Sequence, residues 1–258
     1  MNSQIEYLRE YLRARPLFLS VLRAKEAYLY RDYLPFKKPV LDYGCGDGFF
    51  AKIAFSHENT IDIGLDVRQS RINQAKKQKI YKKTVNYDGK KIPFGNNHFA
   101  TVVSNSVLEH VDGLEEAIAE INRVLKPGGT FLTTVMTNRW EDYLWGAKYF
   151  GNYYKIYMRK KQIHVNLLSR KEWDRMFAKK GFKIKKTVGH LDRFSSGLID
   201  FLHYLSVPSL ISYKLSGKWV IFPLFSDLIF PGKLLIKLTK NNIAADLSGA
   251  LFYELEKK

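Results

Sequence analysis

Short β-branched runs alternate with longer amphipathic stretches between Pro39 and Met136. This alternation is typical of strand and helix units that build a parallel sheet. The pattern therefore predicts a series of strands with helices between them. The expected strands are Pro39–Tyr43, Thr60–Asp66, Thr84–Asp88, Phe99–Ser104 and Thr130–Met136, and the expected helices are Gly48–His57, Gln69–Gln78 and Leu114–Leu125.

The helix expected at Leu114–Leu125 carries the clearest start and stop signals. Its apolar residues recur at helical spacing, and Glu115 and Glu116 stand in the first turn, where the helix dipole favours acidic side chains. The sequence Lys-Pro-Gly-Gly at 126–129 should end it, because proline cannot continue a helix and glycine permits the turn into the next strand.

Further helices are expected on both sides of this core. Residues Ile5–Leu34 predict one or two amphipathic helices interrupted at Pro16. Another helix is expected at Ser169–Lys180, where Ser169 is a suitable N-cap and Glu172 stands three residues later, as in a capping box.

Two more strands are expected near the carboxyl end, at Phe182–Val188 and Ala250–Leu255, with a long apolar and aromatic insertion between them. Prolines and charged residues interrupt its apolar runs well short of the roughly 20 residues that a membrane-spanning helix needs. Short apolar pieces flanked by lysines fit the membrane interface, and they fit a hydrophobic cap or dimer surface equally well. The predicted division is N-terminal cap helices (1–38), an α/β core (39–192) with a basic aromatic segment (138–165), an apolar insertion or lid (193–248) and a final strand (249–258).

Positive charge is concentrated in one part of the chain. The chain has 42 Lys and Arg against 25 Asp and Glu, a formal net charge of +17, and residues 137–190 hold 14 of the basic and 4 of the acidic residues. Tyrosines and tryptophans interleave with these cations. Such a surface fits lipid headgroups, nucleic-acid phosphates or a small acidic substrate, and a solvated basic face or an amphipathic lid is the alternative.

The cysteine content and the first residues bear on the compartment. Cys45 is the single cysteine, so no intrachain disulfide can form and a reducing compartment is expected. The first ten residues mix charged and apolar side chains, whereas a signal peptide needs an unbroken apolar run. We therefore expect a cytoplasmic protein, with peripheral attachment to a membrane as a variant of that expectation.

A glycine-rich turn follows the first expected strand, where residues 42–48 read Asp-Tyr-Gly-Cys-Gly-Asp-Gly. Glycines there supply backbone conformations that other residues resist and let a ligand approach the backbone closely. The dinucleotide fingerprint Gly-x-Gly-x-x-Gly would need its third glycine at position 49, but that glycine is Gly48. The spacing favours a nucleoside without a pyrophosphate.

Acidic residues end the second and third expected strands. Asp66 can accept hydrogen bonds from both hydroxyls of an adenosine ribose, and a helix N-cap is its alternative role. Asp88, followed by Gly89, can accept one from the adenine amino group, although an Asp-Gly pair is also a common turn. Both acids are candidate ligand contacts, because ligands of open α/β sheets bind outside the carboxyl ends of the strands.

In this order the motifs resemble the class I S-adenosylmethionine-dependent methyltransferases, and among them the group that resembles the ubiquinone and menaquinone biosynthesis methyltransferases. The resemblance covers Pro39–Met136. It implies a Rossmann-like α/β fold, a seven-stranded sheet with helices on both faces and an antiparallel last strand. Relatives usually join the last two strands by a short hairpin, whereas residues 193–248 intervene here. The motifs that carry it are the 42–48 loop, Asp66, Asp88 with Ile92–Phe94, Ser104–Val111 and Leu125–Gly129.

The resemblance also implies which residues bind the cofactor, S-adenosyl-L-methionine. The loop glycines would line its methionine part, Asp42 would position its amino group, and Asn105 and Ser106 would border its methyl-donating end. The full set of expected cofactor contacts is Asp42, Gly44, Cys45, Gly46, Gly48, Asp66, Val67, Asp88, Gly89, Asn105 and Ser106. On its own, Cys45 is equally typical of a small buried apolar residue.

Candidate catalytic residues follow the fourth expected strand. A sulfonium is an activated donor, so the enzyme's main task is to place a nucleophile in line with the methyl group and to exclude water. A base is optional for an amine acceptor and helpful for a hydroxyl or phenol. His110 and Glu109 are the first candidates and His164 is a further one, with a structural role as the alternative for each histidine. No spacing of histidine, cysteine or acidic residues indicates a metal site.

The sequence thus predicts a methyltransferase that modifies an oxygen, nitrogen or carbon atom of a small-molecule or lipid-linked acceptor, in one version at an anionic membrane surface. A methyltransferase of RNA or protein that uses the basic aromatic segment is the second interpretation. A cofactor-binding partner protein without catalysis is the third.

Overall fold

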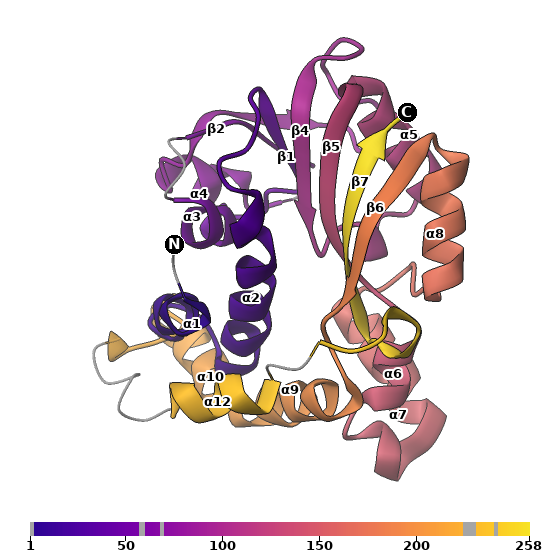
Figure 1. The fold of residues 1–258 in the computed structure, drawn as a ribbon. Coiled ribbons are helices and arrows are strands. Elements are labelled where there is room, and N and C mark those ends of the chain that lie inside the picture. Colours follow the sequence, from indigo (N-terminus) through magenta and orange to yellow (C-terminus); the bar gives the residue numbers. More distant parts are fainter. Residues whose placement is uncertain (1–2, 57–59, 68–69, 224–230, 240–241) are drawn as a thin grey trace.

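Seven strands form one central sheet in the computed structural model, which describes residues 3–56, 60–67, 70–223, 231–239 and 242–258. The strand order is β3-β2-β1-β4-β5-β7-β6, and Figure 1 shows β5, β7 and β6 side by side. β7 runs antiparallel to β5 and β6, while the other neighbours are parallel, so the expected sheet is confirmed. The strands are β1 Val40–Tyr43, β2 Ile61–Val67, β3 Tyr81–Tyr87, β4 Phe99–Asn105, β5 Leu125–Met136, β6 Phe182–Gly189 and β7 Ala250–Lys257.

Helices cover both faces of the sheet and extend beyond it (Figure 1). Within the described residues they are α1 Gln4–Leu12, α2 Leu17–Tyr30, α3 Phe49–Phe55, α4 Ile72–Lys77, α5 Leu114–Val124, α6 Arg139–Tyr143, α7 Ala147–Gln162, α8 Arg170–Lys179, α9 Arg193–Leu205, α10 Val207–Ser216 and α12 Gly232–Thr239, with short 3-10 turns η1 Arg31–Tyr33, η2 Leu108–His110 and η4 Ala245–Leu247.

The junction between α5 and β5 differs from the prediction in both elements, because α5 ends one residue earlier than expected and β5 begins at Leu125, ahead of the predicted Thr130. The helix ends at Val124, and Leu125 is already extended, with φ −78° and ψ 140°. Leu125 pairs with Phe99 of β4, and the ladder resumes between Thr101 and Thr130 after an irregularity. Leu125 is fully buried in the core, so strand pairing prevails over the helical spacing that assigned it to the helix.

Other element boundaries also shift. β3 begins at Tyr81, ahead of the predicted Thr84, because Tyr81 and Lys83 pair with β2. Two predicted helix ends, His57 and Gln69, lie outside the described residues.

Local signals account for the start of α8 and the start of α2. α8 starts with the predicted capping box, in which Ser169 N–H donates to Glu172 Oε2 (2.7 Å) and Glu172 N–H donates to Ser169 Oγ (3.4 Å). The N-terminal region forms two helices, α1 and α2, and Pro16 is the N-cap of the second. The two hydrogen bonds of the capping box satisfy backbone donors that the start of α8 would otherwise leave free.

Each face of the sheet carries its own apolar cluster. Successive side chains of a strand point to opposite faces, so Phe252 joins the cluster under α2 and α3 while Tyr253 joins the cluster under α5 and α8. Tyr30 of α2 is fully buried and packs edge-on against Phe55 and Phe252. Its hydroxyl donates to Ser104 O (3.0 Å), which ties α2 to the sheet.

The insertion between β6 and β7 packs on the N-terminal helices. We call α1, α2, α6, α7, α9, α10 and α12 together the cap; Figure 1 shows α1, α9, α10 and α12 close together beyond the lower end of α2. Lys25 of α2 donates to the backbone oxygen of Thr239 in α12. Asp200 of α9 accepts hydrogen bonds from Gly146 N–H (3.1 Å) and the Tyr154 hydroxyl (2.8 Å), which joins the insertion to α7.

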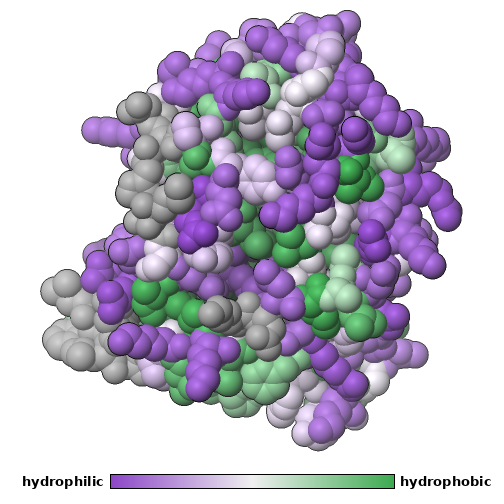
Figure 2. Space-filling model, viewed as in Figure 1, coloured by the Kyte–Doolittle hydropathy of each residue, from purple (hydrophilic) through white to green (hydrophobic). Residues whose placement is uncertain are grey.

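Apolar side chains reach the surface mainly over the cap. Figure 2 shows green patches along the lower edge of the molecule and mostly purple surface over the sheet. Among the described helices, none has both the length and the apolarity required to span a bilayer. The large exposed apolar residues of the cap include Tyr149, Phe150, Tyr153, Leu205, Val207, Leu210, Ile211, Leu215 and Leu234.

Replacing Asp200 with alanine should destabilise the fold by about 1–3 kcal/mol, because Gly146 N–H and the Tyr154 hydroxyl lose a buried acceptor. The measurement is urea unfolding followed by circular dichroism. Asp246→Ala is the matched control, since Asp246 forms an exposed ion pair with Arg170. Its removal should lower the free energy of unfolding by less than about 1 kcal/mol. Equal stability losses in the two variants would show that Asp200 does not hold the insertion to α7.

Candidate active site

The glycine loop after β1 is held in left-handed backbone conformations. Gly44, Gly46 and Gly48 have φ of +78°, +55° and +74°, a region that residues with a side chain rarely adopt. A Cβ atom at Gly44 would lie 2.4 Å from a methyl group of Val107. The predicted need for glycine is therefore confirmed by backbone geometry, and at Gly44 also by a close approach.

The end of β2 holds this loop through hydrogen bonds. Asp66 Oδ2 accepts from Gly46 N–H (2.6 Å), and Asp66 Oδ1 accepts from Val67 N–H (2.7 Å). Burial raises the pKa of Asp66, while these two donors oppose that rise. A carboxylate has about four lone-pair sites, so two remain for ligand hydroxyls.

A cavity of about 750 Å³ opens at the carboxyl ends of β1, β2 and β3. This size is within the roughly 300–1,000 Å³ typical of small-molecule sites. Asp88 is at the surface of this cavity, and its Oδ1 accepts from Lys90 N–H (2.9 Å) and Lys91 N–H (3.1 Å), so it also forms the alternative turn. We call it the cofactor cavity; among its lining residues are the predicted Gly44, Asp66, Val67, Asp88, Gly89 and His110.

The other expected cofactor contacts lie outside that lining. Asp42 is buried, accepts from the Tyr81 hydroxyl (2.6 Å), and has its pKa raised to about 7 by burial. Cys45 packs with Ile72 and Ala75, which matches its alternative as a small apolar residue, and burial raises its pKa. The remaining expected contacts that do not line the cavity are Gly46, Gly48, Asn105 and Ser106.

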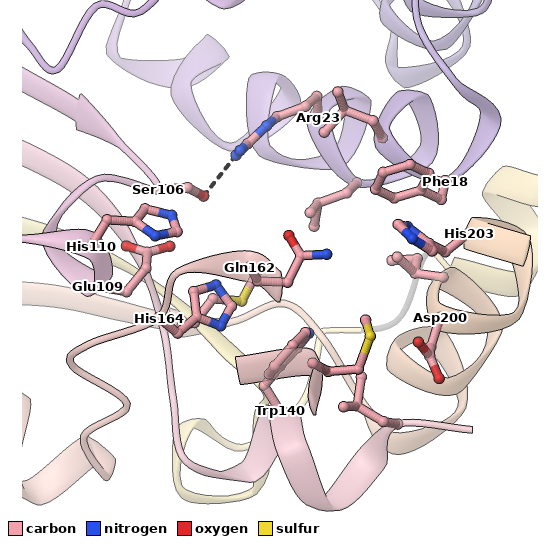
Figure 3. Close-up of a pocket in the computed structure, with 16 residues that line it drawn as sticks. Phe18, Arg23, Ser106, Glu109, His110, Trp140, Gln162, His164, Asp200 and His203 are labelled. Carbon is pink, nitrogen blue, oxygen red and sulfur yellow. Dashed lines mark hydrogen bonds between the residues drawn. The ribbon is translucent and has the colours of Figure 1, made fainter. Parts of the chain in front are cut away.

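A second, smaller cavity of about 90 Å³ lies between the cofactor cavity and the cap (Figure 3). His110 borders both cavities. Figure 3 shows Glu109, His110 and His164 grouped on one side of it, with Arg23 and Ser106 joined by a hydrogen bond above them. We call this cavity the acceptor pocket; its other walls include Phe18, Leu19, Leu22, Met136, Trp140, Leu144, Met158 and Ile199.

Three titratable side chains meet in the acceptor pocket. Glu109 is fully buried, and among the described residues neither of its carboxyl oxygens has a hydrogen-bond partner. Burial raises its pKa to about 8. Burial and the neighbouring His110 lower the pKa of His164 to about 3, so His164 is uncharged at neutral pH.

His110 has one ring nitrogen fixed. Its Nδ1 lies 2.9 Å from Ile163 O, so this nitrogen carries the proton and Nε2 is left as an acceptor. Desolvation of the ring lowers its pKa. The ligand atoms of Glu109, His110 and His164 lie within 4.8 Å of one another, so the group could also hold a metal ion. Sequence spacing did not indicate such a site, because His164 is brought in from a distant segment.

Two residues of α2 complete the site and were missed by the sequence analysis. Arg23 donates to Ser106 Oγ (2.6 Å) and pairs with the buried carboxylate of Glu26. Glu26 in turn accepts from Asn105 Nδ2 (2.8 Å) and Ser106 Oγ (3.0 Å). Charged residues within an otherwise apolar helix were the available signal.

The sheet order and the cavity at its carboxyl edge are those of the class I S-adenosylmethionine-dependent methyltransferase fold. The chain belongs to the family described as "Methyltransferase domain", whose model matches residues 5–187. Its cofactor is S-adenosyl-L-methionine, and the left-handed loop and the spare lone pairs of Asp66 fit an adenosyl compound. Membership of the ubiquinone and menaquinone group stays a prediction.

Relatives of known activity match part of the chain. A malonyl-[acyl-carrier protein] O-methyltransferase of Legionella pneumophila is 31% identical over 101 residues, which are 38% of this chain and 36% of the relative. A sterol 24-C-methyltransferase of Schizosaccharomyces pombe is 33% identical over 135 residues, 50% of this chain and 36% of the relative. The chain thus spans about a third of the length of these relatives.

Solved structures share the fold over nearly the whole chain. The geranyl diphosphate C-methyltransferase of Streptomyces coelicolor A3(2), in complex with Mg²⁺, geranyl diphosphate and S-adenosyl-L-homocysteine, has a TM-score of 0.59 at 16% identity, with 94% of this chain and 84% of that chain covered. A possible histamine N-methyltransferase from Thermotoga maritima has a TM-score of 0.58 at 17% identity, with 93% of each chain covered.

Replacing Asp66 with alanine should weaken S-adenosylmethionine binding by about 1–3 kcal/mol, because the ribose loses an acceptor and the loop loses its contact with β2. Isothermal titration calorimetry gives the affinity. Asp62→Ala is the control on the same strand, since Asp62 contacts Val40 N–H and Lys82 and does not line the cavity. Unchanged affinity in Asp66→Ala would remove Asp66 from the site.

Proposed function

We propose that this methyltransferase modifies a small-molecule or lipid-linked acceptor at an oxygen, nitrogen or carbon atom, at a membrane surface. The observation that carries the proposal is the acceptor pocket, which is small, has apolar side chains in half of its lining and shares His110 with the cofactor cavity. Such a pocket admits the reacting end of a small or chain-like molecule. The relatives support this class, since their names specify sterols, a malonyl group on a carrier protein, and geranyl diphosphate.

The proposed catalytic residues are His110 and Glu109, with His164 beside them. S-adenosylmethionine supplies, when bound, a methyl group on a positively charged sulfur. His110 borders both cavities, so the reacting atoms meet beside its Nε2. A carboxyl group with a pKa near 8, such as Glu109, can exchange a proton with an acceptor hydroxyl or amine. The apolar walls exclude water from this exchange.

The surface of the cap supports action at a membrane. On α10, Ile211 and Leu215 are 54% and 84% exposed, and on α7 Tyr153 is 80% exposed. Lysines and arginines accompany these side chains along α7. Exposed apolar rings and chains beside cations are suited to the headgroup layer of an anionic membrane.

A second candidate is methylation of RNA or protein. The exposed rings of Tyr149, Phe150 and Tyr153 next to cations could stack bases and hold phosphates. The α7 cations are partly neutralised, however, because Lys155 pairs with Asp142 (2.6 Å) and Arg159 pairs with Glu141. The ion pairs weaken attraction to any phosphate, and the lipid interpretation is favoured by the apolar residues exposed on α10, which a nucleic acid would not cover.

Tritium from methyl-labelled S-adenosylmethionine should enter material that is soluble in organic solvent when the protein is incubated with a cell lipid extract. Vesicles containing phosphatidylglycerol should bind the protein and phosphatidylcholine vesicles should bind it several-fold more weakly, because anionic lipid attracts the cations. The Ile211→Ser, Leu215→Ser double variant should lose most vesicle binding. Leu247→Ser, which removes an exposed leucine outside the cap, should not. Label in RNA or protein fractions instead would contradict the lipid assignment.

Glu109→Gln should lower the methyl-transfer rate to the labelled acceptor by about 10²–10⁴-fold if the acceptor loses a proton, the usual range for a positioned acid or base. Its pKa of about 8 makes the group a carboxylate only at higher pH, so the wild-type rate should rise from pH 6 to 9. The variant should show no such rise. The rates are measured with EDTA present, so that a bound ion does not ionise the group.

Glu115→Gln is the control for that variant, because Glu115 lies on the surface of α5, pairs there with Lys179 and lines neither cavity. Both variants should bind S-adenosylhomocysteine with wild-type affinity. A Glu109→Gln enzyme with the wild-type rate and pH profile would exclude Glu109 from proton transfer.

A further inference from the structure

A third cavity, of about 490 Å³, lies beside the acceptor pocket, between the cap on one side and Asp47, Phe49 and Arg71 on the other. The two share Phe18, Leu19, Arg23 and His203 in their walls. This third cavity has no lining residue in common with the cofactor cavity, and none of the loop glycines lines it. We call it the cap groove. The shared walls make it a continuation of the acceptor pocket.

The walls of the cap groove are mainly aromatic and aliphatic. The ring of Phe49 packs edge-on against Tyr11 at 5.3 Å and lies under the Arg15 guanidinium at 4.1 Å. At the other side Trp219 stacks on Tyr213, with ring centres 4.2 Å apart. Such surfaces bind hydrocarbon through the removal of apolar area from water.

Positive charge lies at the rim of this groove. Arg15 is paired with Asp47 at 2.6 Å, which is the acidic residue of the lining. Arg71 lies 6.0 Å from the Tyr213 ring, and Lys161 Nζ lies 2.9 Å from His203 Nε2. In the described part of the chain, neither of these two cations has a carboxylate partner. The rim therefore favours an anion.

The same groove meets the exposed apolar face of α10. Val207 and Leu210 line the groove and are also 47% and 43% exposed. The apolar surface continues along the helix to the exposed Ile211 and Leu215. Val207 and Leu210 therefore join the apolar face of α10 to the groove.

We propose that the cap groove binds the hydrocarbon chain of the acceptor, and that the acceptor carries a phosphate or carboxylate held at the rim by Arg71 and Lys161. The atom that receives the methyl group lies at the inner end of the chain, in the acceptor pocket. This assignment rests on the proposed function and specifies its acceptor as a single-chain anionic amphiphile.

The test measures binding of dodecyl phosphate and dodecanoate below their micelle concentrations by isothermal titration calorimetry. Both should bind the full-length protein, whereas dodecanol should bind at least tenfold more weakly and butyl phosphate should not bind measurably. The anion that binds more tightly identifies the acidic group of the acceptor as a phosphate or a carboxylate. Absence of binding by both anions, or equal binding of dodecanol, would overturn the assignment.

Variants locate the binding site. Leu19→Trp fills the wall that the groove and the acceptor pocket share, and it should weaken dodecyl phosphate binding at least tenfold. Arg71→Gln with Lys161→Gln should weaken it about five- to tenfold. The controls are Leu234→Trp on the outside of α12 and Lys183→Gln on β6, which should stay within twofold. Wild-type affinity in Leu19→Trp would overturn the assignment.

Two readouts separate this assignment from the proposed function. S-adenosylhomocysteine should bind every variant with wild-type affinity, which shows that each is folded, and it should bind together with dodecyl phosphate. Mutual exclusion would assign the groove to the cofactor and overturn the proposal. If labelled methyl enters lipid equally in wild type and Leu19→Trp, the proposed function stands and the groove assignment fails. If dodecyl phosphate binds as expected but no lipid is labelled, the groove stands and the proposed function fails.

Discussion

The hydrogen bonds between the end of β2 and the glycine loop are the constraint on which the site depends. Asp66 accepts from Gly46 N–H, and Leu65 O accepts from Gly44 N–H (2.8 Å) and Cys45 N–H (3.1 Å). These bonds keep the loop in a conformation that is available to glycine and strained for other residues. Gly44 and Asp66 also line the cofactor cavity, so the backbone fixes the shape of this part of its wall.

The cap depends in turn on buried polar contacts of α2. Burying a charge is costly unless it is paired and hydrogen-bonded. Glu26 meets that condition through Arg23, Asn105 and Ser106, and it thereby fixes α2 over the end of β4. One helix therefore forms a wall of the acceptor pocket and of the cap groove. The position of α2 therefore sets the shape of both cavities.

The sheet could be predicted, and with it part of the cofactor cavity, because their signals are local. Alternating runs mark the strands, Ser169 and Glu172 mark the start of α8, and the glycines mark the loop. Parallel strands bring their carboxyl ends to one edge, so residues such as Asp66 and Asp88 meet wherever the strands pair.

On the acceptor side the sequence indicated Glu109, His110 and His164 as candidates, but it could not predict that they meet or that α2 contributes. His164 joins Glu109 and His110 through packing of the segment after α7, and Arg23 reaches Ser106 from a helix far away in the sequence. The periodicity or spacing within one segment cannot predict contacts between segments that lie far apart in the sequence. The path of the insertion across α1 and α2, which creates the cap groove, is likewise set by long-range packing.

The central claim is that an adenosyl sulfonium compound lies between Asp66 and Gly89 with its sulfur toward His110. A crystal structure with bound S-adenosylhomocysteine tests it most directly. The account predicts ribose hydroxyls on the Asp66 carboxylate, adenine beside Asp88 and Gly89, and the sulfur at the junction of the cofactor cavity and the acceptor pocket. A ligand in the cap groove, or a sulfur that faces away from Glu109 and His110, would contradict it.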